Sequence, residues 1–551
     1  MLRLSLTILA TALFASPQSG RELDLRIQLP DASLDGPVSG RIRCGEGAES
    51  AVEIDAQGRI SVRGPQGATC QIRFAVKEKE FGVIVKLGTH EFETVTASAW
   101  GSTGILGRLD DTSRDFTAVA DLAPSAARDS AGISLAGTVS AESSDTIEGA
   151  SVAGREKAHQ AGTLTAGAVD DLVHADSFAN FVESTRPDGP SRLVGKRWAG
   201  VRVVDADGRG LSGIEVRVGG RRLLSRADGS AVVLDGLDAP DASDGLTATI
   251  AGVRRVSLRP GHLERVQLNA RSRVGESADV LLILDTTGSM GDELSYLKTE
   301  LEAIMRRVES RHPNVDIRWG LIVYRDRGDE YVARGLHFTR DFERFQGALA
   351  EQAAMGGGDA PEAVDTAFQT ANQLDWRPAS EAARFVLHVA DAPPRANRMK
   401  DALVAVQSLR DQGTAVYPVA ASGIDEDAEV FMRSAALMTG GQYVFLTDDS
   451  GYGLPHREAT ASCFKVDTLA VVLGTILHAE LRGERPVLPP GDRGTCGEQA
   501  VVRDGGGPER STPRRIGVSR QPPRNGLHRS LFDDDAASAY FGEPFVRTTR
   551  P

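Results

Sequence analysis

The sequence predicts a multidomain protein in which a doubly wound α/β domain follows two small β-sandwich domains. Its 551 residues are enough for about two to four domains. Short strand-like runs separated by turn residues occupy residues 23–95 and 197–270. Residues 277–450 instead alternate apolar strands with amphipathic helices. This alternation is typical of a parallel sheet with helices on both faces.

Composition and charge favour ordinary globular domains and argue against one class of partner. Hydrophobic residues make up 41% of the chain and charged residues 25%, which is usual for soluble domains. The formal net charge is −13. A protein that binds nucleic acid needs a basic face for the phosphates, so we expect no nucleic-acid partner.

The N-terminus, residues 1–20, reads as a secretory signal peptide. Arg3 precedes the apolar run Leu4–Ala15, which ends in a small residue. About 20 apolar residues are needed to span a membrane, and this run is shorter. No other stretch of the sequence qualifies as a membrane span, so we expect a secreted or periplasmic protein.

Four cysteines, Cys44, Cys70, Cys463 and Cys496, have no zinc-site spacing. Export permits disulfides, and four cysteines allow three pairings. The local pairing, Cys44–Cys70 and Cys463–Cys496, is the simplest because each pair lies within one segment.

The N-terminal half divides by composition. Residues 21–110 read as the first β-sandwich, and residues 111–195 as an Ala-, Ser- and Gly-rich linker. Residues 196–272 alternate like strands, and their pattern VRVVDADGRGLSGIEVRVGGRRLLSRADGSAVV resembles carboxypeptidase-regulatory-like and transthyretin-like sandwiches. Asp205 does not open an EF-hand, because Val216 stands where a bidentate Glu is required.

The α/β region begins with the continuous apolar run Val280–Leu284, as expected of a strand that is buried on both faces. A helix follows, with apolar residues along one stripe from Leu294 to Val308. The later elements alternate in order: strand Ile317–Tyr324, helix Glu362–Leu374, strand Phe385–Ala390, helix Lys400–Leu409, strand Ala415–Val419, helix Glu426–Met438 and strand Gln442–Leu446. Residues 451–485 contain a further amphipathic helix, and residues 486–551 read as a disordered tail.

An oxygen-rich motif follows the first buried strand of this region. In Asp285-Thr286-Thr287-Gly288-Ser289, the spacing places three oxygen side chains, Asp285, Thr287 and Ser289, on one tight loop. Ligands of doubly wound sheets bind beyond the carboxyl ends of the strands. Oxygen ligands suit a hard divalent cation. The motif therefore predicts a metal site at this edge of the sheet.

Three segments in order resemble the von Willebrand factor A (VWA) domain. DTTGSMGDEL resembles its metal-ion-dependent adhesion site (MIDAS), GGGDAPEAV the loop with the fourth metal position, and VLHVADAPP the strand end with the final Asp. The resemblance implies a Rossmann-like domain over residues 277–450 that binds Mg²⁺, with Mn²⁺ or Ca²⁺ as alternatives. The implied metal residues are Asp285, Thr287, Ser289, Asp359 and Asp391.

The resemblance also implies a role for each metal residue. The hydroxyls of Thr287 and Ser289 coordinate the cation directly, and Asp285 and Asp391 hold its waters or contact it. Familiar members carry Thr at the fourth position, where this chain has Asp359. The extra carboxylate should bind the metal more firmly and weaken its pull on a partner's carboxylate. Thr366 is the substitute candidate if Asp359 does not contribute.

Three classes of function remain open from the sequence. The favoured one is a non-enzymatic binding or adhesion protein whose metal engages a protein or glycan partner through a carboxylate. The alternatives are an enzyme or effector that uses the domain for recognition, and a periplasmic assembly or stress scaffold. Ser289 does not fit a nucleophile elbow, because Thr287 stands where Gly is needed. The tripeptide Arg327-Gly328-Asp329 reads as a coincidence, and His388 as a core residue.

Overall fold

The computed structural model describes most of the chain between residues 21 and 494. The described ranges are 21–29, 34–45, 47–77, 79–99, 162–173, 175–186, 188–234, 246–357, 361–451, 455–461 and 463–487, with short strand pieces at 127–129, 132–134, 146–147, 150–151 and 493–494. The predicted signal peptide and nearly all of the predicted tail lie outside these residues. Within them, no helix combines the length and apolarity needed to cross a membrane.

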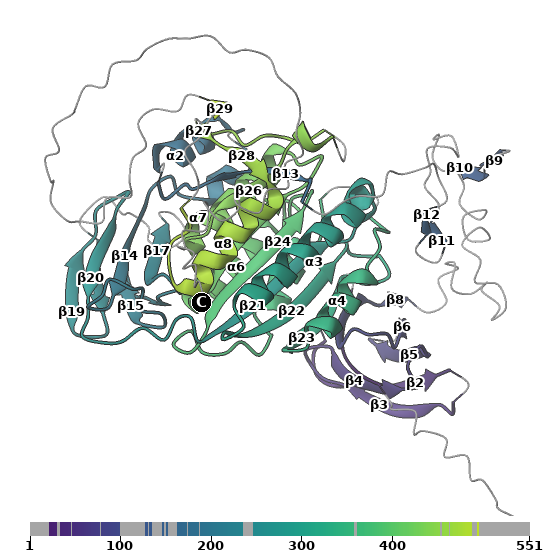
Figure 1. The fold of residues 1–551 in the computed structure, drawn as a ribbon. Coiled ribbons are helices and arrows are strands. Elements are labelled where there is room, and N and C mark those ends of the chain that lie inside the picture. The colour runs from purple at the N-terminus through teal and green to yellow at the C-terminus, as the bar shows by residue number, and fades with distance from the viewer. Residues whose placement is uncertain are drawn as a thin grey trace, which may run out of the picture.

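A parallel sheet of five strands and one antiparallel neighbour forms the centre of the molecule (Figure 1). In sheet order its strands are β26 (Tyr443–Leu446), β25 (Ala415–Ala420), β24 (Ala383–Ala390), β21 (Ser277–Asp285), β22 (Asp316–Tyr324) and β23 (Ala333–Thr339). Only β23 is antiparallel to its neighbour β22. The chain leaves β21 toward β22 and later returns to β24 on the other side. In doubly wound sheets, ligands bind at the carboxyl edge where the strand order reverses in this way.

Helices cover both faces of this sheet. The residues buried on one face come from α3 (Leu294–Arg311), α4 (Phe342–Ala350) and α8 (Leu469–Arg482). Those on the other come from α5 (Val364–Ala371), α6 (Met399–Asp411) and α7 (Glu426–Thr439). The predicted apolar stripe of α3 is confirmed. Its members are all buried: Leu294, Leu297, Leu301, Ile304, Met305 and Val308. The predicted three-layer arrangement of this region is therefore correct.

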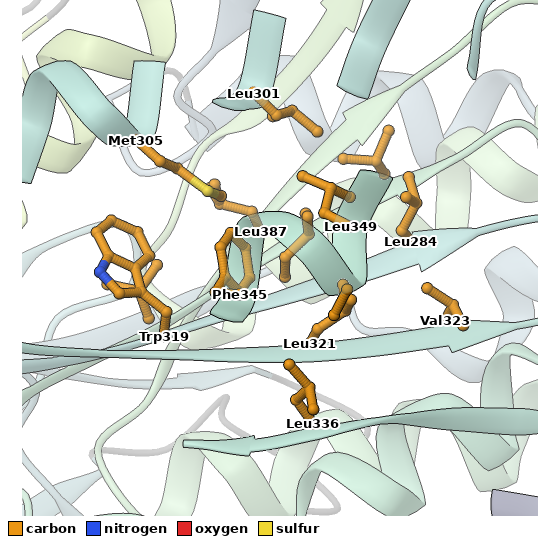
Figure 2. Packing of buried hydrophobic residues seen from close by; sticks show 14 of the residues in the cluster. Leu284, Leu301, Met305, Trp319, Leu321, Val323, Leu336, Phe345, Leu349 and Leu387 are labelled. Atoms are coloured by element: carbon orange, nitrogen blue, oxygen red, sulfur yellow. The ribbon is translucent and has the colours of Figure 1, made fainter. Parts of the chain in front are cut away.

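The core between α3, α4 and the sheet combines aliphatic side chains with a few aromatic ones (Figure 2). Trp319 of β22 packs edge-on against Phe342 of α4 at 5.3 Å between ring centroids, and against Phe345 at 5.7 Å. Met305 and Leu301 approach from α3. Burying such side chains contributes about 25 cal/mol per Å² of apolar surface, which fixes the strands that carry the site.

The N-terminal region is a two-sheet sandwich that shares a sheet with the central domain. Its first sheet contains β4 (Arg59–Gly64), β1 (Arg21–Gln28) and β7 (Phe92–Thr96), and its second contains β3 (Ser50–Ile54), β2 (Val38–Cys44), β5 (Thr69–Val76), β6 (Lys79–Lys86) and β8 (Ser98–Ala99). Residues Phe92–Thr94 of β7 pair with Ala333–Gly335 of β23. The central sheet therefore has eleven strands, and the expectation of a separate β domain is wrong in this respect. The free edge of β23 supplies the unpaired N–H and C=O groups that this pairing uses.

The two cysteine predictions have different outcomes. Cys44 and Cys70 stand opposite each other on β2 and β5, and a disulfide joins them with an S–S distance of 2.05 Å. Cys463 begins β27 (Cys463–Phe464), whose backbone pairs with β29 (Arg493–Gly494). Cys496 lies outside the described residues, so the second bridge stays a prediction.

The predicted linker over residues 111–195 is wrong for its last part. β13 (Thr165–Val169) lies between β26 and β28 (Val466–Thr468) in the central sheet, and α2 (Ala175–Ser184) buries Phe178 and Phe181 in the core. A 3₁₀ turn, η3 (Pro190–Leu193), follows. The described residues in the earlier part of this range form two-stranded pieces, β9 (Ala127–Asp129) with β10 (Gly132–Ser134), and β11 (Thr146–Ile147) with β12 (Ala150–Ser151).

A buried carboxylate holds the segment that leads into β13. Glu300 of α3 accepts hydrogen bonds from the N–H groups of Gly162, Thr163 and Leu164 at 2.7 to 3.0 Å. The central sheet also continues beyond residue 450. β28 extends the sheet, and α8, the helix predicted within residues 451–485, lies beside α3 in the core.

The second sandwich is built from residues 198–267. One sheet contains β17 (Ser230–Leu234), β14 (Trp198–Val204) and β20 (Leu263–Gln267), and the other contains β16 (Arg221–Leu224), β15 (Glu215–Val218), β18 (Thr247–Ile250) and β19 (Arg254–Ser257). Their inner faces form one core. Asp205 accepts hydrogen bonds from the N–H groups of Asp207, Arg209 and Ser272, so it serves a turn, as the sequence predicts.

Candidate metal centre

The first part of the centre is the loop that follows β21. Asp285 is the last residue of this strand and is fully buried. Its Oδ1 atom accepts hydrogen bonds from the Thr287 N–H at 2.9 Å and from the Thr287 hydroxyl at 2.7 Å. The Thr287 hydroxyl lies 3.1 Å from the hydroxyl of Ser289, which is an exposed residue. The loop thus arranges three oxygen side chains from the interior to the surface.

Asp391 comes from the neighbouring strand. It follows β24, which runs parallel to β21, so the two strands end at the same edge of the sheet. Burial raises the pKa values of Asp285 and Asp391 above their ordinary range. The Asp285 charge raises the pKa of Asp391 further, and the nearby Ser289 hydroxyl opposes this. The structure therefore brings together four of the five predicted residues.

The fifth residue, Asp359, lies outside the described residues, but its flanking segments meet at this edge. The backbone carbonyl of Gly356 accepts a hydrogen bond from the Gly288 N–H at 2.9 Å. Gly356 and Gly357 have φ values of +72° and +64°, which glycine adopts at little cost. After the gap, the N–H of Glu362 donates to the Pro393 carbonyl at 3.0 Å, just beyond Asp391. The assignment of Asp359 stays a prediction.

The donor set fits a divalent cation. Asp285 Oδ2 and Asp391 Oδ1 are buried oxygens with no hydrogen-bond partner among the described residues. Burial of an unpaired carboxylate is costly, and a cation offsets that cost. In the described part of the chain, no three His, Cys, Asp or Glu side chains form a metal site by themselves. The fit therefore depends on the two hydroxyls and on Asp359, an all-oxygen set of the kind that Mg²⁺ prefers.

Comparison with known families identifies this part of the chain. Residues 279–448 match the family model of the von Willebrand factor A domain. These residues are a VWA domain. The match lies within the predicted range of 277–450 and contains both Asp285 and Asp391.

Curated relatives share only a short part of their length with this chain. The chain is 33% identical over 135 residues to alpha-protein kinase vwkA of Dictyostelium discoideum, a match that covers 24% of this chain and 21% of that protein. It is 30% identical over 126 residues to von Willebrand factor A domain-containing protein 7 of Homo sapiens, covering 22% and 13% respectively. The chain thus spans about a fifth or less of the length of these relatives.

Solved structures align at low sequence identity. The conserved hypothetical protein BatB from Bacteroides thetaiotaomicron is 17% identical, with a TM-score of 0.23 over 30% of this chain and 89% of that chain. The pilus adhesin SpaC from Lactobacillus rhamnosus GG is 11% identical, with a TM-score of 0.27 over 38% of this chain and 30% of that chain.

Glu362 is a residue of the VWA domain's carboxyl edge that the sequence interpretation did not select. It is 2% exposed, and burial together with the charges of Asp285 and Asp326 raises its pKa to about 9. The segment GGGDAPEAV contains it, so the signal was a Pro-Glu pair directly after the predicted metal loop. Its burial, however, depends on the fold and is not visible in the local sequence.

The Arg-Gly-Asp tripeptide is part of the framework of this edge. The Arg327 guanidinium donates to Asp365 at 2.6 Å and to the Thr366 hydroxyl at 3.1 Å. Asp329 accepts the N–H of Gly357 at 2.9 Å and so holds the glycine loop. Both charged groups are engaged within the domain, which agrees with the interpretation of the tripeptide as a coincidence. Thr366 is likewise committed to Arg327.

A second set of side chains braces the start of α3. Glu293 is fully buried and accepts the Ser422 N–H. Its Oε2 atom lies 3.0 Å from His456 Nε2, and His456 Nδ1 lies 2.8 Å from Asp448. Burial alone would lower the pKa of His456, but its hydrogen bonds to these two carboxylates raise it above the ordinary value. His456 therefore ties the segment after β26 to the metal-site loop.

His388 is a core residue, as its place on a buried strand predicts. It is fully buried on β24, and its Nε2 atom lies 3.1 Å from the Tyr324 hydroxyl. Burial lowers its pKa to about 3, so the ring is neutral. Phe368 and Phe431 pack edge-on against it.

Proposed function

We propose that the chain is an exported binding protein whose VWA domain engages a partner through a bound divalent cation. The observation that carries this proposal is the layout of the centre: the carboxylate oxygens of Asp285 and Asp391 are buried and unpartnered, whereas Ser289 is exposed above them. A cation held by such a set has one side toward solvent. Mg²⁺ is the first choice, with Mn²⁺ and Ca²⁺ as alternatives.

The rim of the centre supports a role in binding macromolecules. Gly288 and Gly291 are exposed and leave the loop without bulky side chains. Met355, beside them on the glycine loop, is 45% exposed, and flexible Met side chains suit adaptable contacts. When bound, the cation would supply a Lewis-acidic position for an oxygen ligand. We infer that the partner is a protein or glycan that presents a carboxylate to it.

A binding role is the proposal for the whole chain, and no enzymatic activity is assigned to it. The kinase activity in the name of the Dictyostelium relative belongs to that protein. The match covers only 21% of its length. The residues of the centre serve as oxygen donors to a cation: Asp285 holds Thr287 in place, and Thr287 in turn contacts Ser289.

Export is part of the same proposal. The N-terminal apolar run predicts cleavage between about residues 15 and 22. The Cys44–Cys70 disulfide suits an oxidising compartment. Mass spectrometry of the exported fraction tests this, because an intact Met1 would contradict it.

The binding test uses peptides of defined chemistry. The full chain is passed over immobilised Asp- and Glu-containing peptides, each matched by an Asn or Gln peptide, in Mg²⁺ and in EDTA. We expect retention on carboxylate peptides only with the metal, and loss of this retention in Ser289→Ala. Ser295→Ala, which removes an exposed hydroxyl of α3, is the control. Equal retention in EDTA, or on the amide peptides, would contradict the proposal.

A further inference from the structure

Glu362 has a buried carboxyl group that the described contacts leave without a partner. The residue is 2% exposed, and its Oε2 atom is buried without any hydrogen bond. No ion pair or hydrogen bond involves this carboxyl group among the described residues, although the backbone N–H is fixed to the Pro393 carbonyl at 3.0 Å. Burial disfavours the ionised form of such a group, so a carboxylate at this position requires a cation to compensate its charge.

The carboxyl group faces the metal loop. A Cβ atom placed on Gly357 would lie 3.1 Å from Glu362 Oε1 and 3.1 Å from Thr287 Cβ. Glu362 and Thr287 therefore lie on either side of Gly357, which has no side chain. A glycine with positive φ at this point keeps the space between them open.

Nearby arginines do not serve Glu362. Arg327 pairs with Asp365 at 2.6 Å, Arg325 contacts Glu330 at 3.3 Å, and Arg395 pairs with Asp326. These three arginines thus neutralise other carboxylates, and none of them forms an ion pair with Glu362.

We propose that Glu362 belongs to the metal centre and holds a water molecule of the cation through its carboxylate. This inference rests on the proposed function, because it assumes the cation at Asp285, Thr287 and Ser289. Asp285, Asp391 and Glu362 do not by themselves form a three-carboxylate site in the described structure. A water between Glu362 and the cation bridges that separation, and Mg²⁺ characteristically keeps several waters.

The consequence is a centre that binds its cation firmly before any partner arrives. Carboxylates that hold the ligands of a metal typically change its affinity 10- to 100-fold when they are removed. Glu362 adds one such carboxylate beyond those of the sequence motif. Its negative charge also opposes the approach of a partner's carboxylate, so contacts on the rim must contribute to partner binding.

The test measures Mn²⁺ affinity of the full chain by calorimetry. The variants are Glu362→Gln, which keeps the shape and removes the charge, and Glu330→Gln, which removes an exposed carboxylate from the same edge. We expect Glu362→Gln to weaken Mn²⁺ binding at least tenfold and Glu330→Gln less than twofold. Thermal unfolding in EDTA checks folding: Glu362→Gln should unfold at the wild-type temperature or above it, because it removes a carboxyl group whose ionisation is disfavoured by burial in the folded protein.

Each other outcome overturns the inference. If Glu362→Gln binds Mn²⁺ as tightly as the wild type while Asp285→Asn does not bind it, the proposed metal site stands and the role of Glu362 is wrong. If Glu330→Gln weakens binding as much as Glu362→Gln, the effect is general charge and the role is also wrong. If Asp285→Asn binds as tightly as the wild type, the proposed function fails as well.

Discussion

Asp279 and Asp285 lie at opposite ends of the same strand, β21, and both are fully buried. Asp279 is well supplied with donors: the Arg318 guanidinium donates to both of its oxygens at 2.8 and 2.7 Å. Arg377 donates to Oδ1 through its guanidinium and to Oδ2 through its backbone N–H, each at 2.8 Å. Asp285 accepts hydrogen bonds from Thr287 through Oδ1, the Tyr324 hydroxyl also acts to lower its pKa, and its Oδ2 atom is buried without a hydrogen-bond partner within the described residues. One strand therefore carries a balanced buried charge at its start and an unbalanced one at its end.

The comparison separates structural from functional burial of charge. A buried carboxylate that is paired and fully hydrogen-bonded serves the fold, and breaking such a pair leaves uncompensated cations behind. A buried carboxylate that lacks a partner lowers stability unless a bound ligand neutralises its charge. The first kind should respond to mutation as a stability site and the second as a binding site.

The largest expected effect is on stability and follows from removing the charge of Asp279. Asp279→Asn leaves Arg318 and Arg377 without their shared charge, although both arginine side chains are only 14–15% exposed. We expect a loss of about 3–5 kcal/mol in the free energy of unfolding. Urea denaturation in EDTA measures it, with Asp285→Asn as the matched variant on the same strand. Asp285→Asn should change stability by less than about 1 kcal/mol; equal losses in the two variants would erase the distinction.

A smaller loss of stability is expected at Gly357, which leaves open space between Thr287 and Glu362. Gly357→Ala forces a side chain onto a backbone with φ of +64° and fills the gap between Thr287 and Glu362. The backbone strain alone costs about 1–3 kcal/mol. Gly220→Ala is the control, because Gly220 has φ of +84° with open space around it.

Both glycine variants should lose similar stability in urea denaturation, but only Gly357→Ala should also weaken Mn²⁺ binding in calorimetry. Unchanged Mn²⁺ affinity in Gly357→Ala would show that the gap has no part in the metal centre.

The smallest effect concerns pH. The pKa of His456 is raised in the folded protein, so its contacts with Glu293 and Asp448 stabilise the fold fully below the unfolded pKa of about 6.5. This contribution is lost as pH rises through the folded pKa. It should be about 1 kcal/mol or less, since Asp448 is largely exposed.

Urea denaturation of the wild type and of His456→Gln between pH 5 and 9 measures this contribution. The difference in stability between the two proteins should shrink as pH rises. A difference that grows with pH would contradict the assignment of a charged His456.

The sequence predicted what depends on local pattern. The run Val280–Leu284 became the central strand, and the stripe of α3 faces the core. Asp285, Thr287 and Ser289 meet because their spacing forces it, and Asp391 joins them because its strand ends at the same edge. These features follow from periodicity and strand order alone.

What escaped prediction depends on partners far away in the chain. The strand Thr165–Val169 consists mostly of small residues without alternation, and it is a strand only because β26 and β28 flank it. Phe92–Thr94 joins the central sheet because β23 has a free edge. The isolation of Glu362 depends on which arginines are already engaged, and no local pattern shows that.

The most direct test of the account is anomalous diffraction from crystals of the full chain soaked in Mn²⁺. The account predicts one peak at the end of β21, within reach of Asp285 Oδ2, Thr287 and Ser289, and none beside Asp279. Absence of a peak at the end of β21 under saturating Mn²⁺, with the loop itself well ordered, would contradict the claim that this unbalanced carboxylate is a metal site.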